Sequence, residues 1–206
     1  MCTRFYIRRD EREITEIIER IQSSLLFRRF IEAGKEVVVC GEIRPTNVVP
    51  VIATNRDGKQ TAFPMQWGFQ LNGRSPLVNA RSESAATKPT FREAWAKHRC
   101  IIPASWYFEW EHLIDDAGKK KTGAKYMIRP KEPGMTWLCG LYRLEDGLPA
   151  FTVLTRESST ELGRIHDRMP LILPKEKIRD WIDPDHDPAE LLRYSLSDMV
   201  FEEAEL

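Results

Sequence analysis

Residues 36–67 (EVVVCGEIRPTNVVPVIATNRDGKQTAFPMQW) decide the fold class of this chain. The segment contains successive apolar runs rich in valine, which are separated by short polar stretches, and this pattern is typical of β-strands. Asp57-Gly58 stands between the last two runs, and this dipeptide favours a tight turn between antiparallel strands. The segment therefore predicts several consecutive strands that pair with their neighbours.

Further apolar runs follow along the chain, and short helical patterns interrupt them. The runs are residues 99–105, 106–110, 124–130, 136–144, 148–155 and 169–174. Upstream, a short strand over residues 4–8 leads into a helical pattern over about residues 10–33, with Asp10 as its cap and Gly34 at its end. Many strands with scattered helices predict an α+β fold of one domain, residues 1–206. Its sheet is expected to be strongly bent, mostly antiparallel and barrel-like, with several peripheral helices.

The composition indicates a globular protein without a strong electrostatic bias. Of the 206 residues, 42% are hydrophobic and 30% are charged, which is ordinary for soluble domains. Lys+Arg and Asp+Glu both number 31, so any contact with nucleic acid would need a local basic patch. No apolar stretch has the length of a transmembrane helix, and the first residues lack the apolar core of a secretory signal. We therefore expect a cytoplasmic location and no membrane partner.

The cysteines and histidines do not indicate a metal site. The four cysteines form no CxxC pair and the four histidines show no zinc-like spacing. Cys40, Cys100 and Cys139 lie in apolar runs, and they are predicted to be small buried core residues on strands. The sequence thus indicates no disulfide framework, no metal and no cofactor.

Cys2 differs chemically from the other cysteines because it directly follows the initiator methionine. A small second residue permits removal of Met1, and Cys2 would then carry both an α-amine and a β-thiol. An aldehyde can react with both groups, since the amine forms an imine and the thiol then closes a five-membered thiazolidine ring. An interior cysteine cannot do this because its nitrogen is held in an amide. The alternative for Cys2 taken alone is an incidental N-terminal cysteine, which is the commoner case.

Three further polar clusters interrupt the strand pattern. Asn79 and Arg81 are two residues apart, so an extended backbone points both to one face. Glu109 lies among aromatic residues. Aromatic surroundings tend to raise the pKa of a carboxyl, and a raised pKa suits the carboxyl to proton transfer near neutral pH. His166 stands between a short helix and a strand. The alternatives are that Asn79 holds a turn, Arg81 pairs with Glu83 on the surface, Glu109 faces solvent, and His166 is a capping or core residue.

Together these motifs resemble one family. MCTRF, NARSE, RCIIPASWYFEW, LTRESS and IHDRMPLIL occur in the order, and at roughly the spacing, of the SOS response-associated peptidase-like (SRAP) family. The resemblance spans nearly the whole chain and implies covalent capture of abasic sites in single-stranded DNA during the DNA damage response. The sequence departs from the family at Thr3, which is usually glycine, and at Ser105-Trp106, where the family usually has Asp-Gly.

The resemblance implies a catalytic role for each cluster. Cys2, freed by Met1 removal, supplies both nucleophiles and forms the thiazolidine link that protects the lesion. Glu109 accepts a proton from the amine and later returns one. His166 donates to the sugar ring oxygen and favours the aldehyde, and Asn79 orients the Cys2 backbone or the sugar.

The resemblance also implies a set of DNA contacts. Arg4 and Arg81 are expected to bind phosphates that flank the lesion, as guanidinium groups do well. An apolar wedge is expected to stack on bases and favour single strands, and Trp110 is expected to contact DNA as well. The wedge consists of Pro45, Trp67 and Phe69. A single strand carrying an abasic site is thus the expected partner, with the protein acting as a monomer that is nucleoid-associated when bound.

Amine basicity explains why the terminus would attack and a lysine would not. An α-amine titrates near ~7.7–8.0 and a lysine near ~10.4, so roughly a tenth of the first and under about a thousandth of the second is neutral at pH 7. Two other functions remain open. One is a cysteine peptidase, including self-processing, that uses Cys2 and His166 with Asn79 as orienter. The other is a DNA-binding module without covalent chemistry.

Overall fold

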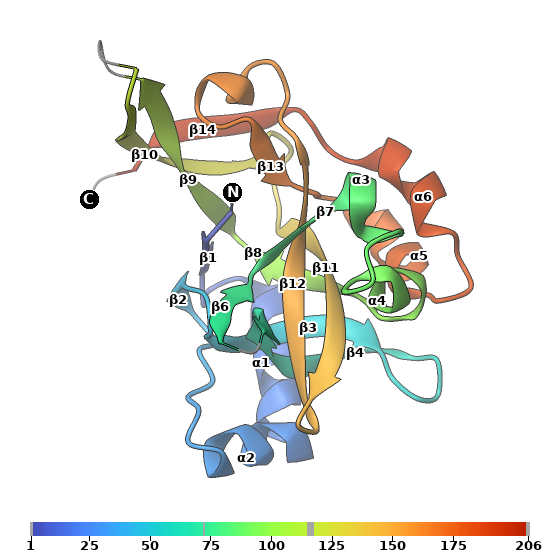
Figure 1. The fold of residues 1–206 in the computed structure, drawn as a ribbon. Coiled ribbons are helices and arrows are strands. Elements are labelled where there is room, and N and C mark those ends of the chain that lie inside the picture. The colour runs from blue at the N-terminus through green and yellow to red at the C-terminus, as the bar shows by residue number, and fades with distance from the viewer. Residues whose placement is uncertain (1, 72, 115–117, 205–206) are drawn as a thin grey trace.

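A computed structural model describes residues 2–71, 73–114 and 118–204, and Figure 1 shows how their elements are arranged. One sheet has five strands in the order β14-β10-β9-β1-β2. All of its neighbouring strands are antiparallel. Its strands are β1 (Arg4–Ile7), β2 (Gly41–Ile43), β9 (Trp106–Ile114), β10 (Lys120–Pro130) and β14 (Met199–Glu203).

The second sheet closes on itself. Its strands follow the order β11-β8-β3-β4-β12, and an additional pairing of β11 with β12 completes the ring, while β13 and β7 extend from β12. The β4–β12 contact is parallel and the other pairs of the ring are antiparallel. These strands are β3 (Val48–Thr54), β4 (Gln60–Trp67), β7 (Asn79–Arg81), β8 (Arg99–Ala104), β11 (Thr136–Glu145), β12 (Leu148–Glu157) and β13 (Arg168–Pro170). The predicted barrel-like, mostly antiparallel sheet is confirmed.

Helices and a small hairpin surround the sheets (Figure 1). The hairpin pairs β5 (Phe69–Leu71) with β6 (Arg74–Leu77). The helices are α1 (Arg12–Gln22), α2 (Leu25–Glu32), α3 (Ser82–Ala85), α4 (Arg92–Lys97), α5 (Ile178–Ile182) and α6 (Pro188–Leu191), with 3₁₀ turns η1 (Leu162–Arg164), η2 (Lys175–Lys177) and η3 (Leu192–Tyr194). Their peripheral placement confirms the predicted α+β class.

The single helix predicted over residues 10–33 is wrong, because the structure has two helices there. Ser24 separates them: its hydroxyl accepts a hydrogen bond from the Phe27 N–H at 3.2 Å and so caps α2. Serine bonds the backbone well at a helix start and poorly supports a helix interior, so the chain ends one helix and begins another at this point. The predicted cap is also wrong, since Glu11 occupies the N-cap position of α1 and Asp10 pairs with Arg8.

The cysteine predictions hold at two of three positions. Cys100 and Cys139 are fully buried on β8 and β11, as predicted. Cys40 is partly exposed and lies outside any strand, so its prediction is wrong. Gly41, the next residue and the first of β2, has a φ of +92°, a conformation that favours glycine and that sets the start of β2 at this residue.

Arg99 is a buried cation that the sequence did not single out. The residue is 1% exposed, and within the described part of the chain its guanidinium donates to backbone carbonyls alone. The acceptors are Trp181 at 2.6 Å, Trp95 at 2.8 Å, Ala96 at 2.7 Å, His186 at 2.9 Å, and Asp183. Because these carbonyls belong to α4, α5 and the turn after α5, Arg99 fastens the helices at one end of the barrel to β8.

Arg99→Met is therefore expected to destabilise the protein strongly. Methionine fills similar space but leaves several buried carbonyls without a donor, and each hydrogen bond to a charged group is worth about 1.5–3 kcal/mol. We expect the free energy of unfolding in urea to fall by at least ~3 kcal/mol. Arg179→Met, at an exposed arginine of α5, is the matched control and should change stability little. Equal unfolding midpoints for the two variants would contradict the role given to Arg99.

Candidate functional site

A cleft of about 640 Å³ lies where β1, β7, β9 and the loop before β13 meet. Its lining residues come from segments far apart in the sequence. They are Thr3, Arg4, Arg81, Glu109, Trp110, His112, Thr122, His166, Asp167 and Arg168. The fold thus brings five of the ten residues predicted to be functional into the lining of one cleft, namely Arg4, Arg81, Glu109, Trp110 and His166.

Cys2 is held rigidly beside this cleft. Its side chain is fully buried, its Sγ donates to the Arg4 carbonyl at 3.7 Å, and its own carbonyl accepts a hydrogen bond from Asn79 Nδ2 at 2.9 Å. Burial, with the nearby Glu109 carboxylate as a further cause, raises the pKa of the Cys2 thiol far above its ordinary value. The thiol is therefore neutral here and is not poised as a thiolate nucleophile. Met1, whose removal the predicted chemistry requires, lies outside the described residues.

Asn79 and Arg81 lie on β7, which pairs in parallel with β12. Asn79 contacts the Cys2 backbone, whereas Arg81 is exposed at the cleft and forms no ion pair within the described ranges. The alternative pairing of Arg81 with Glu83 is wrong. The Glu83 carboxylate instead accepts two hydrogen bonds, at 2.8 and 2.9 Å, from the buried guanidinium of Arg168. Arg81 consequently keeps its charge available for an anion.

The Glu109 side chain lies on the inward face of the five-stranded sheet and is 4% exposed. It lies on β9, where β1 and β10 flank it, so the alternative that it points to solvent is wrong. Burial is the main cause that raises the pKa of its carboxyl. Its Oε1 accepts a long hydrogen bond of 3.4 Å from the Trp110 N–H. A buried carboxyl with a raised pKa can both accept and return a proton near neutral pH.

His166 is a neutral hydrogen-bond donor in this arrangement. It is 7% exposed, and burial is the main cause that lowers its pKa to about 4. Its Nδ1 accepts a hydrogen bond from the Arg168 N–H at 2.9 Å, so Nε2 carries the ring proton. The Asp167 carboxylate lies 2.8 Å from the same nitrogen, but its side chain is 82% exposed and can turn away, whereas the Arg168 amide is fixed.

His112 is a cleft residue that sequence reasoning missed. Its ring lies 4.1 Å from the His166 ring, centroid to centroid, and its backbone N–H donates to the Ile165 carbonyl at 3.0 Å. This bond joins the far half of β9 to the loop that carries His166. The sequence offered only a weak signal, because His112 lies near Glu109 on one strand but far from His166 along the chain.

The predicted DNA wedge is wrong for two of its residues. Trp67 and Phe69 are fully buried, and a side chain without exposed surface cannot stack on a base. Trp67 packs between Phe5 and Phe151, and its Nε1 donates to the Val78 carbonyl at 2.9 Å. Pro45 is partly exposed, but it lies in the loop between β2 and β3 and does not line the cleft. Trp110 does line the cleft and is partly exposed.

The departures from the family pattern are accommodated locally. Thr3 lines the cleft without hydrogen-bonding through its side chain to the described residues. The Ser105 hydroxyl accepts from the Arg8 N–H at 2.9 Å and donates to Glu11 at 2.8 Å, which ties the start of β9 to α1. The Trp106 ring stacks on Tyr6 at 4.6 Å and 4°. These contacts hold the strand that presents Glu109.

Two classes of feature are missing from the described ranges. No group of three or more His, Cys, Asp or Glu side chains within residues 2–71, 73–114 and 118–204 could hold a metal ion. In the same ranges, no helix is both long and apolar enough to cross a membrane.

Comparisons with known proteins agree with the motifs. The sequence model of the family described as SOS response associated peptidase (SRAP) matches residues 1–205. Abasic site processing protein YobE of Bacillus subtilis (strain 168) is 37% identical over 181 residues, covering 77% of this chain and 80% of YobE. Abasic site processing protein YoqW of the same organism is 29% identical over 213 residues, covering 97% of this chain and 90% of YoqW. The crystal structure of a phage-related protein from Bordetella bronchiseptica superimposes with a TM-score of 0.74 at 21% identity, covering 100% of this chain and 95% of that one. That structural likeness shows the fold alone.

Proposed function

Because this chain belongs to the SOS response associated peptidase (SRAP) family, we propose that it processes abasic sites by linking itself covalently to DNA. The relatives compared above are named abasic site processing proteins. The proposed substrate is the ring-opened aldehyde of an abasic site in single-stranded DNA. The proposed product is a thiazolidine between the sugar and Cys2, which protects the lesion during the DNA damage response, at the nucleoid in the cytoplasm. The protein is proposed to act as a monomer.

One observation carries the proposal: Asn79 fastens the carbonyl of Cys2 at 2.9 Å, at the edge of a cleft that also holds Glu109 and His166. This bond fixes the residue that would carry both nucleophilic groups. A carboxyl with a raised pKa and a neutral imidazole donor then lie beside it. Acid–base groups held in this way are what stepwise addition to an aldehyde requires.

The proposed reaction begins at the α-amine freed by Met1 removal. His166 donates a hydrogen bond from Nε2 to the sugar ring oxygen and keeps its proton. The C1′ hydroxyl releases its proton to solvent, the bond between C1′ and the ring oxygen breaks, and the ring oxygen takes up a proton from solvent, so the sugar opens to the aldehyde. The amine nitrogen adds to the aldehyde carbon, and Glu109 relays one proton from the nitrogen to the aldehyde oxygen, which becomes a hydroxyl. Glu109 then relays the second nitrogen proton to this hydroxyl, which leaves as water, and an imine forms. Addition of Sγ to the imine carbon closes the ring, and the thiol proton passes to nitrogen. The net change is the release of one water.

The state of the Cys2 thiol supports amine attack before sulfur attack. A buried, neutral thiol is a weak external nucleophile, but once the imine exists it can add within the same residue. The neutral thiol and the hydrogen bonding of His166 give less support to a peptidase mechanism, in which the histidine would have to remove the thiol proton. His166 holds a proton on Nε2 and accepts the Arg168 amide on Nδ1, so neither ring nitrogen is free to take the thiol proton.

The decisive experiment is denaturing electrophoresis of the protein with a single-stranded oligonucleotide that carries one abasic site. Intact mass spectrometry first establishes that Met1 is absent. We expect a heat-stable complex, and we expect none after the terminal amine has been acetylated. Peptide cleavage that survives acetylation would favour a thiol peptidase. Reversible binding with no covalent band would favour a simple DNA-binding module. Either result would contradict the proposal.

A further inference from the structure

The outer face of the five-stranded sheet carries a row of aromatic side chains that the proposed chemistry does not use. Successive residues of a strand point to opposite faces. On β9, Tyr107 and Glu109 point inward and are buried, so Trp106, Phe108 and Trp110 share the outward face. Trp106 and Trp110 are partly exposed, and Phe108 is buried between them. We call these three side chains, with Tyr6 of β1, the aromatic row.

Contacts between the rings, and with Lys125, hold the aromatic row in place. Tyr6 pairs with Trp106 across the β1–β9 ladder, and the two rings are stacked at 4.6 Å. Trp106 meets Phe108 edge to face at 6.4 Å and 84°. The Lys125 ammonium covers Phe108 at 3.9 Å and approaches Trp110 at 5.5 Å. The exposed aromatic surface is therefore concentrated at the two ends of the row.

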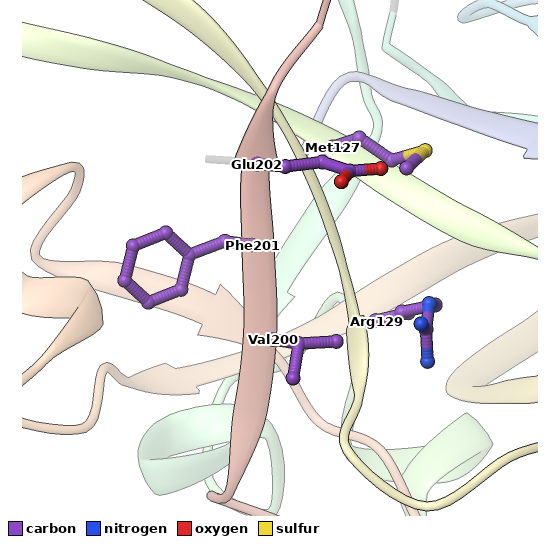
Figure 2. A pocket seen from close by; sticks show the side chains of 5 residues that line it. All are labelled: Met127, Arg129, Val200, Phe201 and Glu202. Carbon is purple, nitrogen blue, oxygen red and sulfur yellow. The ribbon is translucent and has the colours of Figure 1, made fainter.

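One end of the row opens into the candidate site, because Trp110 lines the cleft with Arg4. The other end opens into a groove of about 820 Å³ between α1 and β10, whose lining includes Trp106, Arg8 and Arg129. Figure 2 shows Met127, Arg129 and Glu202 on one side of β10 and β14, with Phe201 turned away from them. Met127 and Arg129 also line this groove, so it runs along the outward face.

The charges of this face favour an anionic chain with exposed bases. The strands of this face carry the cations Arg4, Lys125 and Arg129 and the acids Glu42 and Glu202. The groove lining adds the cations Arg8, Arg12 and Lys131 and the acids Glu11 and Glu13. Glu42 pairs with Arg4 and Lys125, and Arg8 pairs with Asp10. Arg129 forms no ion pair with the described part of the chain; its Nη1 donates to the Pro130 carbonyl at 3.3 Å. The face is thus slightly cationic, and aromatic surface is its main feature.

The length of the row fits a few nucleotides. Trp106 and Trp110 are four residues apart on one strand, which corresponds to about 13 Å at ~3.3 Å per residue. Stacked nucleotides rise by about 3.4 Å each, so the row spans about four of them. Aromatic side chains on a sheet bind single strands by stacking on bases, with little dependence on sequence.

We propose that the aromatic row binds the unpaired DNA on one side of the lesion, by stacking of bases on the Tyr6–Trp106 pair. This inference rests on the proposed function, because the bound segment belongs to the strand whose abasic site enters the cleft. It adds a binding surface outside the cleft. The faces of the bases are covered in double-stranded DNA, so the aromatic row would bind single strands selectively. It would thereby take the role that the sequence analysis gave to Trp67 and Phe69, which are buried.

The test compares unmodified oligothymidylates of about 5 and about 15 nucleotides, lengths that bracket the short and long ends of known site sizes. Fluorescence anisotropy measures the affinity of the wild-type protein, Trp106→Ala, Arg129→Gln and the control Tyr194→Ala. Tyr194 is 39% exposed and packs against Lys177 and Arg193, away from this sheet. We expect Trp106→Ala to weaken binding of the longer strand roughly 10-fold. We expect Tyr194→Ala to change neither affinity.

Arg129→Gln keeps the proposal testable if Trp106→Ala folds poorly. Removing one phosphate contact should lower the salt slope of binding of the longer strand by about 0.7. Unchanged affinity in Trp106→Ala, or an unchanged salt slope in Arg129→Gln, would overturn the proposal.

Wild-type cross-linking to an abasic oligonucleotide is measured in parallel. If cross-linking succeeds and both variants bind like wild type, this surface is wrong and the proposed function stands. If cross-linking fails while the variants lose affinity, the surface stands and the covalent function is wrong.

Discussion

Cys2→Ala is expected to abolish the heat-stable DNA adduct. The variant still has an α-amine after Met1 removal, so it can form an imine, but it has no sulfur to close the thiazolidine ring. An imine hydrolyses during heating, so we expect the adduct to fall at least ~100-fold, since an unassisted imine lacks the intramolecular trap. Denaturing electrophoresis with an abasic single strand measures the change.

Treatment with borohydride distinguishes the role of the Cys2 amine from that of the Cys2 thiol. Reduction converts an imine into a stable amine, so treated Cys2→Ala should give a permanent adduct although the untreated variant gives none. Cys40→Ala is the matched control, because Cys40 is a partly exposed cysteine outside the cleft, and it should behave like wild type. A wild-type level of heat-stable adduct in untreated Cys2→Ala would remove sulfur from the reaction. Absence of any adduct after reduction would remove the amine.

Glu109→Gln is expected to slow adduct formation by about 10²–10⁴-fold, the range for a lost acid–base group. Glutamine keeps the size and polarity of the side chain but cannot take the proton from the attacking amine. Reversal of the adduct should slow as well, because the same group returns the proton. Rapid-quench sampling of adduct formation measures the first rate, and transfer of protein to fresh DNA measures the second. Glu111→Gln, a partly exposed glutamate two residues along β9, should leave both rates unchanged.

The pH dependence gives an independent check on Glu109. A general base works in its ionised form, so the rate it supports is full above its pKa and falls as the pH drops through that pKa. Burial raises the pKa of Glu109, so this fall should begin above the ordinary glutamate value of ~4.3. The amine adds a separate decline toward acid pH in both proteins. Only wild type should show the additional fall. A rate profile with the same shape in Glu109→Gln would assign the proton transfer to another group.

Burial changes the pKa values of three side chains at the site, and the direction of the change depends on the group. Burial makes the Cys2 thiol neutral and keeps the His166 ring neutral, with opposite directions of pKa change. It also raises the pKa of the Glu109 carboxyl above its ordinary value. These pKa changes favour the neutral forms of the thiol, the imidazole and the carboxyl, so the site does not stabilise a thiolate, and the proposed imine formation is compatible with them.

Local sequence patterns determined much of the fold and the chemical nature of the site. Apolar runs and the Asp57-Gly58 turn predicted the strands, because side-chain alternation and turn chemistry depend only on near neighbours. The position of Cys2 suggested a reaction with an aldehyde, which stays a prediction. The spacing of Asn79 and Arg81 predicted that an extended backbone would point both side chains to one face, and the structure gives residues 79–81 the extended conformation of β7.

Only the tertiary structure decided which of these residues meet and which are buried. The bond from Asn79 to Cys2 joins residues 77 positions apart, and the contact of His112 with His166 joins two distant segments. The burial of Trp67 ended its predicted role with DNA. Such contacts depend on how sheets pack over the whole chain, and no local period encodes them. A side chain's type sets the chemistry that it can perform, and long-range packing sets its exposure, its partners and the direction of its pKa change.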